Sequence, residues 1–136
     1  MARDPSALRF SLGGRQRELV EVRAAGELTS DGWLPSDVFI KLGGFTGRFR
    51  ANFLLAELKR FCADVAQLYR RLEGAAVFEP IEGQLKLRLD VDRLGHVAVS
   101  GSAMDVAGTG NRLTFSFIID QSYLPGLLKQ LEATCA

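Results

Sequence analysis

The fold is decided by residues 45–74, which read FTGRFRANFLLAELKRFCADVAQLYRRLEG. Apolar and polar residues alternate through the first part of this stretch, as they do in a β-strand with one buried face. From Leu54 onward the apolar residues recur every three or four positions, which indicates an amphipathic helix of about five turns. Gly74 follows the last apolar position and is expected to end the helix. The stretch therefore predicts a strand that runs directly into a long, core-facing helix.

Further strands are predicted on both sides of this helix. Before it, apolar and polar residues alternate around residues 8–12, 20–24 and 37–42. After it, three more strands are predicted, with the clearest alternation over residues 84–92, and Ser122 is expected to cap a final helix. Short turns between consecutive strands favour antiparallel hairpins over parallel crossovers. The predicted fold class is α+β, an antiparallel β-sheet of about six to eight strands packed against two α-helices, in the order strands, helix, strands, helix.

The composition indicates one folded domain that spans residues 1–136. Apolar residues make up 47% of the chain, which is enough to bury a core and argues against disorder. Seventeen basic residues stand against sixteen acidic ones, so the formal net charge is +1. A nucleic-acid binder usually carries a marked basic excess. We therefore expect no nucleic acid as a partner, and no acidic mimicry of one.

The cellular location is predicted from two features of the sequence. No apolar run approaches the roughly 18 residues that a membrane-spanning helix needs, and residues 1–5 lack the apolar segment of a signal peptide. We therefore expect a cytoplasmic protein without a membrane partner. Cys62 falls on the apolar side of the predicted helix, which indicates a packed thiol. A disulfide between Cys62 and Cys135 is the alternative, but a protein that is not exported favours reduced thiols.

Catalytic, metal and cofactor sites have little support in the residues. The single histidine, His96, lies on the polar face of a predicted strand, where a surface or hydrogen-bonding role is usual. Asp90 and Asp92 could hold a cation, although solvated carboxylates beside a turn explain them better. Asp120, at a strand-to-helix junction, is a conceivable catalyst but is better explained as a cap. With neither a GxSxG elbow nor a Walker-type loop in the chain, we predict no enzyme activity, catalytic residue, metal or cofactor.

Five residues are candidates for contact with a partner. Arg48 and Arg50 lie on one face of a predicted strand, so that their guanidinium groups can act together on carboxylates or phosphates. A solvated or salt-bridged outer face is the simpler interpretation of this pair. Trp33 and Phe39 lie off the regular apolar face and could form an adhesive patch, unless the final helix covers them. Together with His96, these four residues make up the predicted partner-binding set.

Several motifs carry a family resemblance. They are GFTGRF at 44–49, the apolar helix positions between 58 and 74, GHV at 95–97, and the segment 113–124 that ends in IDQSYL. In combination, over residues 8–132, these motifs resemble the WapI-type immunity proteins, a family of small bacterial proteins. The family usually has threonine after Asp-Gln, and Ser122 keeps the hydroxyl group. The recurring residues of the family, which map here onto Gly44, Gly47, Gly95, Asp120 and Gln121, are explained as turns and caps.

The resemblance implies a function that the residues alone do not. It implies protection against a contact-dependent toxin by binding of the toxin's C-terminal domain. Some toxins of this kind cleave RNA. It implies no catalytic residue, because the family carries no established catalytic set. Two alternatives stay open from the residues. One is a small ligand-binding domain or enzyme with His96 and either Asp120 or Asp90 at its polar centre. The other is a self-associating module that forms a homodimer through an exposed edge strand.

Overall fold

The computed structural model describes residues 4–14 and 18–135, and for Cys135 it describes the backbone only. The described residues form eight strands and two α-helices, with the short 3₁₀ turns η1 (Pro5–Ala7) and η2 (Gln121–Tyr123). The helices are α1 (Leu55–Arg71) and α2 (Leu124–Cys135). The strands are β1 (Arg9–Gly13), β2 (Glu18–Ala24), β3 (Trp33–Leu42), β4 (Phe45–Leu54), β5 (Ala75–Phe78), β6 (Leu85–Val91), β7 (His96–Met104) and β8 (Arg112–Asp120).

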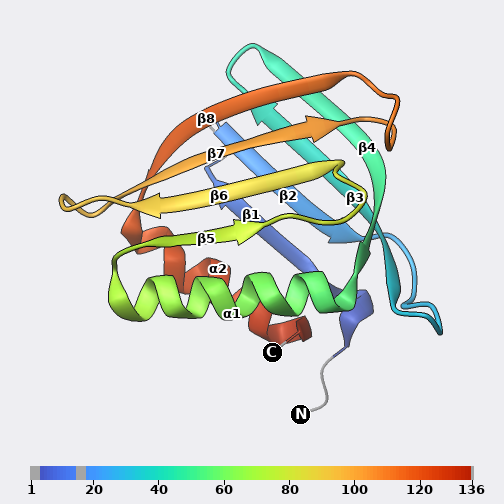
Figure 1. Cartoon of the computed structure of the whole chain (residues 1–136), viewed down its shortest axis with the longest axis horizontal. Coiled ribbons are helices and arrows are strands. Elements are labelled where there is room, and N and C mark those ends of the chain that lie inside the picture. Colours follow the sequence, from blue (N-terminus) through green and yellow to red (C-terminus); the bar gives the residue numbers. More distant parts are fainter. Residues whose placement is uncertain (1–3, 15–17, 136) are drawn as a thin grey trace.

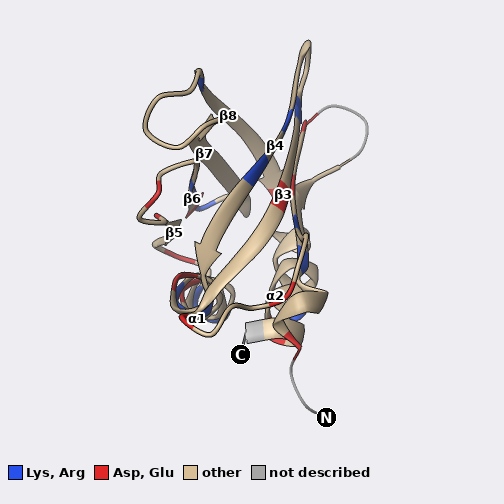
Figure 2. Cartoon of the chain, turned by 90° about the vertical axis from the view of Figure 1, so that its right-hand side faces the viewer, with Lys and Arg blue, Asp and Glu red and all other residues tan. Residues whose placement is uncertain are grey.

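The strands form two antiparallel sheets, each a simple meander. The N-terminal sheet has the order β1-β2-β3-β4 and the C-terminal sheet the order β5-β6-β7-β8, with α1 leading from one to the other (Figure 1). The two sheets face each other, and both helices lie at the same end of the molecule (Figure 2). The predicted α+β class and element order are thus confirmed. The strands divide into two sheets because the long helix α1 interrupts the run of hairpins after the fourth strand.

A cluster of phenylalanine rings joins the two sheets to α1. Phe78 in β5 lies at its centre, with ring centroids 5.2 Å from Phe53 in β4 and 5.2 Å from Phe61 in α1. Phe10 in β1 is 6.3 Å away in an edge-to-face arrangement. None of the four side chains is more than 1% exposed. Apolar contact of this kind, summed over both inner faces, is the main force that holds the sheets together.

Each helix also covers the outer edge of one sheet. The N–H of Ser11, in edge strand β1, donates a hydrogen bond to Oε1 of Gln130 in α2 at 3.1 Å. The N–H of Val77, in edge strand β5, donates to Oδ2 of Asp64 in α1 at 3.4 Å. Unpaired strand edges are templates for unwanted pairing, and helix side chains here occupy N–H groups on two of the four edges.

A buried polar residue, Gln84, links the two sheets. Its side chain is 6% exposed, and its amide nitrogen donates to the carbonyl oxygen of Arg50 in β4 at 3.0 Å. The same nitrogen lies 3.3 Å from the carbonyl oxygens of Met104 and Asp105, at the end of β7. Buried carbonyl groups need such partners, because an unsatisfied one costs about 1–3 kcal/mol. Gln84 therefore fixes β4 of one sheet to β7 of the other.

The structure corrects two predictions about the ends of the helices. Helix α1 ends at Arg71, and Leu72 rather than Gly74 takes the first left-handed conformation, with φ 52°. The predicted cap Ser122 lies within η2, and Asp120 caps that turn by accepting a hydrogen bond from the N–H of Ser122 at 2.8 Å. Asp120 rather than Ser122 is therefore the cap, because its carboxylate, two residues earlier in the chain, accepts from the free N–H at the start of the turn.

Cys62 is buried on the inner side of α1, as predicted. The side chain of Cys135 lies outside the described residues, so the expectation of reduced thiols, with a Cys62–Cys135 disulfide as its alternative, stays a prediction. Among the described residues, no helix is both long and apolar enough to cross a membrane.

Candidate functional site

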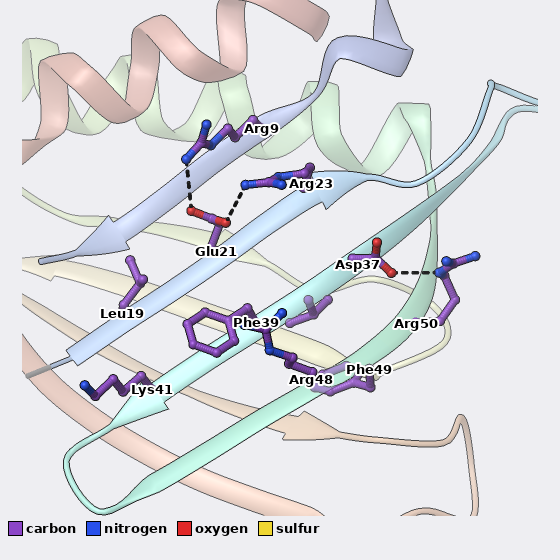
Figure 3. Close-up of a pocket in the computed structure, with 11 residues that line it drawn as sticks. Arg9, Leu19, Glu21, Arg23, Asp37, Phe39, Lys41, Arg48, Phe49 and Arg50 are labelled. Carbon is purple, nitrogen blue, oxygen red and sulfur yellow. Dashed lines mark hydrogen bonds and ion pairs between the residues drawn. The ribbon is translucent and has the colours of Figure 1, made fainter. Parts of the chain in front are cut away.

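The outer face of the N-terminal sheet carries a shallow hollow of about 770 Å³ lined by charged side chains. Figure 3 shows these side chains on β1, β2, β3 and β4, on the side of the sheet that faces solvent. The term basic face is used below for eight of the residues that line the hollow: Arg9, Glu21, Arg23, Asp37, Phe39, Lys41, Arg48 and Arg50.

The period-two pattern of the strands places these residues on one side. Their sequence neighbours, such as Phe10, Val22 and Val38, point inward and are no more than 1% exposed. The strand register then brings residues from different strands together. Arg23 lies opposite Asp37, Asp37 lies opposite Arg50, and Phe39 lies opposite Arg48. Side chains directly opposite one another across antiparallel strands are close enough to interact.

Two carboxylates of the basic face are occupied by arginines. Glu21 lies between Arg9 at 3.6 Å and Arg23 at 3.3 Å. Asp37 accepts a hydrogen bond from Nε of Arg50 at 2.9 Å, and both side chains are more than half exposed. Exposed ion pairs of this kind contribute only about 0–1 kcal/mol to stability. They position the guanidinium groups rather than hold the fold together, and so they leave the arginines able to exchange partners.

The centre of the basic face is aromatic and cationic. The guanidinium carbon of Arg48 lies 4.6 Å from the centroid of the Phe39 ring, which is a cation–π contact. Lys41 and Arg48 have no carboxylate partner among the residues that the structure describes. Five cations and two carboxylates give the basic face three net positive charges. The whole chain carries only +1, so the remaining residues together carry a formal charge of minus two.

The comparisons with known proteins add one decisive finding. A family model described as the immunity protein WapI-like family matches residues 1–136, the whole chain. The chain belongs to the WapI-like immunity protein family. No curated protein and no solved structure shows significant similarity to it. The resemblance noted over residues 8–132 is therefore confirmed and extends over the full sequence.

The predicted partner-binding residues of this WapI-like chain lie in three places. Phe39, Arg48 and Arg50 come together on the basic face, and Arg48 rather than α2 lies over Phe39. Helix α2 packs instead against β1 and α1. Trp33 begins β3, is partly buried and lies outside the hollow, and its backbone N–H donates to Oγ1 of Thr29 at 2.9 Å. His96 begins β7 in the other sheet.

Sequence reasoning missed the other cations of the basic face. Arg9, Arg23 and Lys41 alternate with buried residues in their own strands, just as Arg48 and Arg50 do. That signal was present, and it marks these residues as outward-facing. The sequence does not specify the order of the strands in the sheet, so it could not assign the five cations to one surface.

The polar side chains around His96 stabilise turns rather than form a site. Nδ1 of His96 lies 3.4 Å from Oδ2 of Asp92, and both side chains are about half exposed. Asp120 faces His96 across the β7–β8 pair, while Asp90 is held by two hydrogen bonds from Arg88. The described residues contain no group of three or more side chains suited to hold a metal ion. The cluster forms an open surface at a turn rather than an enclosed site.

Gly95, Asp120 and Gln121 have the turn-and-cap role that was expected for them, whereas Gly47 lies within β4 rather than in a turn. Gly95 has φ +83°, a conformation that L side chains rarely adopt, and its carbonyl oxygen accepts a hydrogen bond from the N–H of Gln121 at 3.0 Å. A Cβ at this position would lie 3.3 Å from the Gln121 side chain. Gly95 therefore allows the β6–β7 turn to pack closely against the start of η2.

Backbone N–H groups lower the pKa of two carboxyl groups beside His96. The N–H of His96 donates to Oδ1 of Asp92 at 2.9 Å, as does the N–H of Leu94 at 2.8 Å, and these bonds hold the pKa of Asp92 below its usual value. The N–H of Ser122 similarly lowers the pKa of Asp120, with smaller contributions from the Ser122 side chain and from His96. Hydrogen bonds to the ionised form favour that form.

These lowered pKa values predict a dependence of stability on acid pH. Because the folded-state pKa of Asp92 lies below the unfolded value, its stabilising contribution is present near neutral pH and is lost as pH falls through the folded pKa. We expect Asp92→Asn to flatten the decline in the free energy of unfolding between about pH 5 and pH 2. Urea unfolding across that range measures the slope. Glu27→Gln, at an exposed carboxyl, controls for the lost charge, and equal slopes in wild type and Asp92→Asn would contradict the assignment.

Proposed function

We propose that this chain neutralises a bacterial contact-dependent toxin by direct, non-catalytic binding to the toxin's C-terminal domain in the cytoplasm. Membership of the WapI-like immunity protein family supports a toxin-neutralising role. The observation that carries the binding mechanism is the basic face, where Phe39 lies under Arg48 among four other cations. Aromatic residues and arginines are enriched at the energetic centres of protein interfaces. Phe39, Arg48 and Arg50 are therefore the proposed contact residues.

Co-expression with the toxin domain encoded beside this gene tests the proposal. We expect the chain to restore growth and to co-purify with the toxin domain from the same cells. A toxin domain inactivated at its catalytic residue serves as the binding control, because it is harmless and can be produced alone. If the chain neither restores growth nor co-purifies with either form, the proposed function is wrong.

Stoichiometry separates binding from an enzymatic antidote. When the purified chain is titrated into a fixed amount of active toxin, a tight binder abolishes toxin activity at a ratio of about one to one, since each complex removes one toxin molecule. An enzyme that modifies the toxin or its product protects at much lower ratios and shows a dependence on time. Protection at a small fraction of the toxin concentration would favour the alternative of a small enzyme over the binding mechanism.

A further inference from the structure

The charge of the basic face identifies the chemistry of the partner. We propose that the basic face docks onto a carboxylate-rich surface of the toxin domain, with aspartate and glutamate side chains of the toxin paired to Lys41, Arg48 and Arg50. This inference rests on the proposed function and goes beyond it, because it commits the interface to one sheet face and to an acidic region of the partner.

The distribution of charge supports an acidic partner. Three net positive charges are concentrated on one face of a chain whose remaining residues are net negative. A charge asymmetry of this kind orients the molecule as it approaches an acidic surface and accelerates association. The outer side of the other sheet has no comparable excess of positive charge, because Asp90, Asp92 and Asp120 lie there and Arg88 is already paired with Asp90.

The cations are available and held in position. Arg48 lies over Phe39 at 4.6 Å from the ring centroid, which limits the freedom of its side chain while it has no carboxylate partner in the described part of the chain. Arg50 donates to Asp37 through Nε, so its terminal nitrogens remain for a second carboxylate. Arginine presents its donors in a fork that matches a carboxylate with two parallel hydrogen bonds.

A protein carboxylate fits the face better than the phosphates of a nucleic acid. Glu21 and Asp37 lie among the cations and would repel the closely spaced charges of a phosphate backbone. Two aromatic residues line the hollow: Arg48 covers the ring of Phe39, and Phe49 is partly buried against the core, so neither offers a free ring for base stacking. Separate carboxylates of a folded protein can instead be placed beside individual cations.

The test compares matched double charge reversals in binding to the catalytically inactive toxin domain. In the face variant, Lys41→Glu is combined with Arg48→Glu, and we expect the dissociation constant to rise by about 100-fold or more, because two attractive contacts become repulsive. In the control variant, Arg93→Glu is combined with Lys129→Glu; both residues are exposed and lie outside the basic face. The control changes net charge equally and should bind within about twofold of wild type.

Three further measurements complete the test. Raising the salt concentration from about 50 to 500 mM should weaken wild-type binding by about tenfold or more and should affect the face variant much less. Circular dichroism checks that both variants are folded, which we expect because Lys41 and Arg48 have no ion-pair partner among the described residues and because Arg93 and Lys129 are exposed. A labelled single-stranded RNA of about 15 nucleotides serves as the probe for nucleic acid.

Each other outcome overturns the inference in a distinguishable way. If wild type protects against the toxin and the face variant binds equally well, the proposed function stands and this interface is wrong. If the control variant loses binding instead, the interface lies on the surface that carries Arg93 or Lys129 and not on the basic face. If RNA binds wild type tightly and the face variant not at all, the face is a nucleic-acid site. If wild type does not bind the toxin domain, the inference and the proposed function both fail.

Discussion

Replacing Phe78 by alanine is expected to lower the free energy of unfolding by about 3–5 kcal/mol. The Phe78 side chain is 1% exposed and contacts rings from β1, β4 and α1, so its removal leaves a cavity where both sheets and a helix meet. Partners from three rigid elements cannot all move inward to fill that space. Urea unfolding at neutral pH, with circular dichroism as the signal, gives the difference directly.

Phe45→Ala is the matched control for this substitution. Phe45 begins β4, and its side chain is 64% exposed, so the same chemical change should alter the free energy of unfolding by no more than about 0.5 kcal/mol. A cost below about 1.5 kcal/mol for Phe78→Ala would mean that the ring cluster is loosely packed. The two sheets would then have to be held together mainly by other contacts.

Gly101→Ala is expected to destabilise the protein by about 2–4 kcal/mol, a large effect for the addition of a single methyl group. A Cβ at this position would overlap the carbonyl oxygen of Lys86 in the neighbouring strand β6, and it would lie 3.1 Å from the ring of Phe115 in β8. Gly101 is central in β7, between Leu87 and Phe115, so neither neighbouring strand can move away without breaking its own pairing. A shift in the urea midpoint measures the loss.

A glycine in an open position should respond in the opposite direction. Gly126 lies in the first turns of α2, and a Cβ built there meets nothing within 4 Å. Alanine is a better helix former than glycine, so Gly126→Ala should raise the free energy of unfolding by about 0.5–1 kcal/mol. Equal effects of Gly101→Ala and Gly126→Ala would contradict the proposed steric origin of the first.

The strand pattern of this chain was readable from sequence because burial follows a period of two. The alternation of Leu85, Leu87 and Leu89 with charged residues specified a strand and its buried face, and the structure places all three leucines in the core. Alternation does not say which strand lies beside which. The pairing of Arg23 with Asp37, and hence the grouping of cations from four strands, depends on the register of the whole sheet.

The candidate site was likewise predictable within one strand but not across strands. Arg48 and Arg50 were recognised as a pair because they share one strand, and the structure adds the neighbours that give the pair its context. His96 could not be excluded from this surface by sequence, since its distance from Arg48 depends on how the chain divides into two sheets. The buried role of Gln84 could not be predicted from the sequence, because a polar residue just before a strand is usually exposed. Only the structure shows the carbonyl groups that it binds.

The amide of Gln84 has a consequence for recognition. By binding the carbonyl oxygen of Arg50, it anchors the backbone of an interface strand to the opposite sheet, on the far side from any partner. Main-chain freedom at this position is therefore lost during folding rather than at the moment of association, so less conformational entropy opposes the complex. Side chains on such an anchored strand can be exchanged to suit a new partner while the main chain that presents them keeps its course.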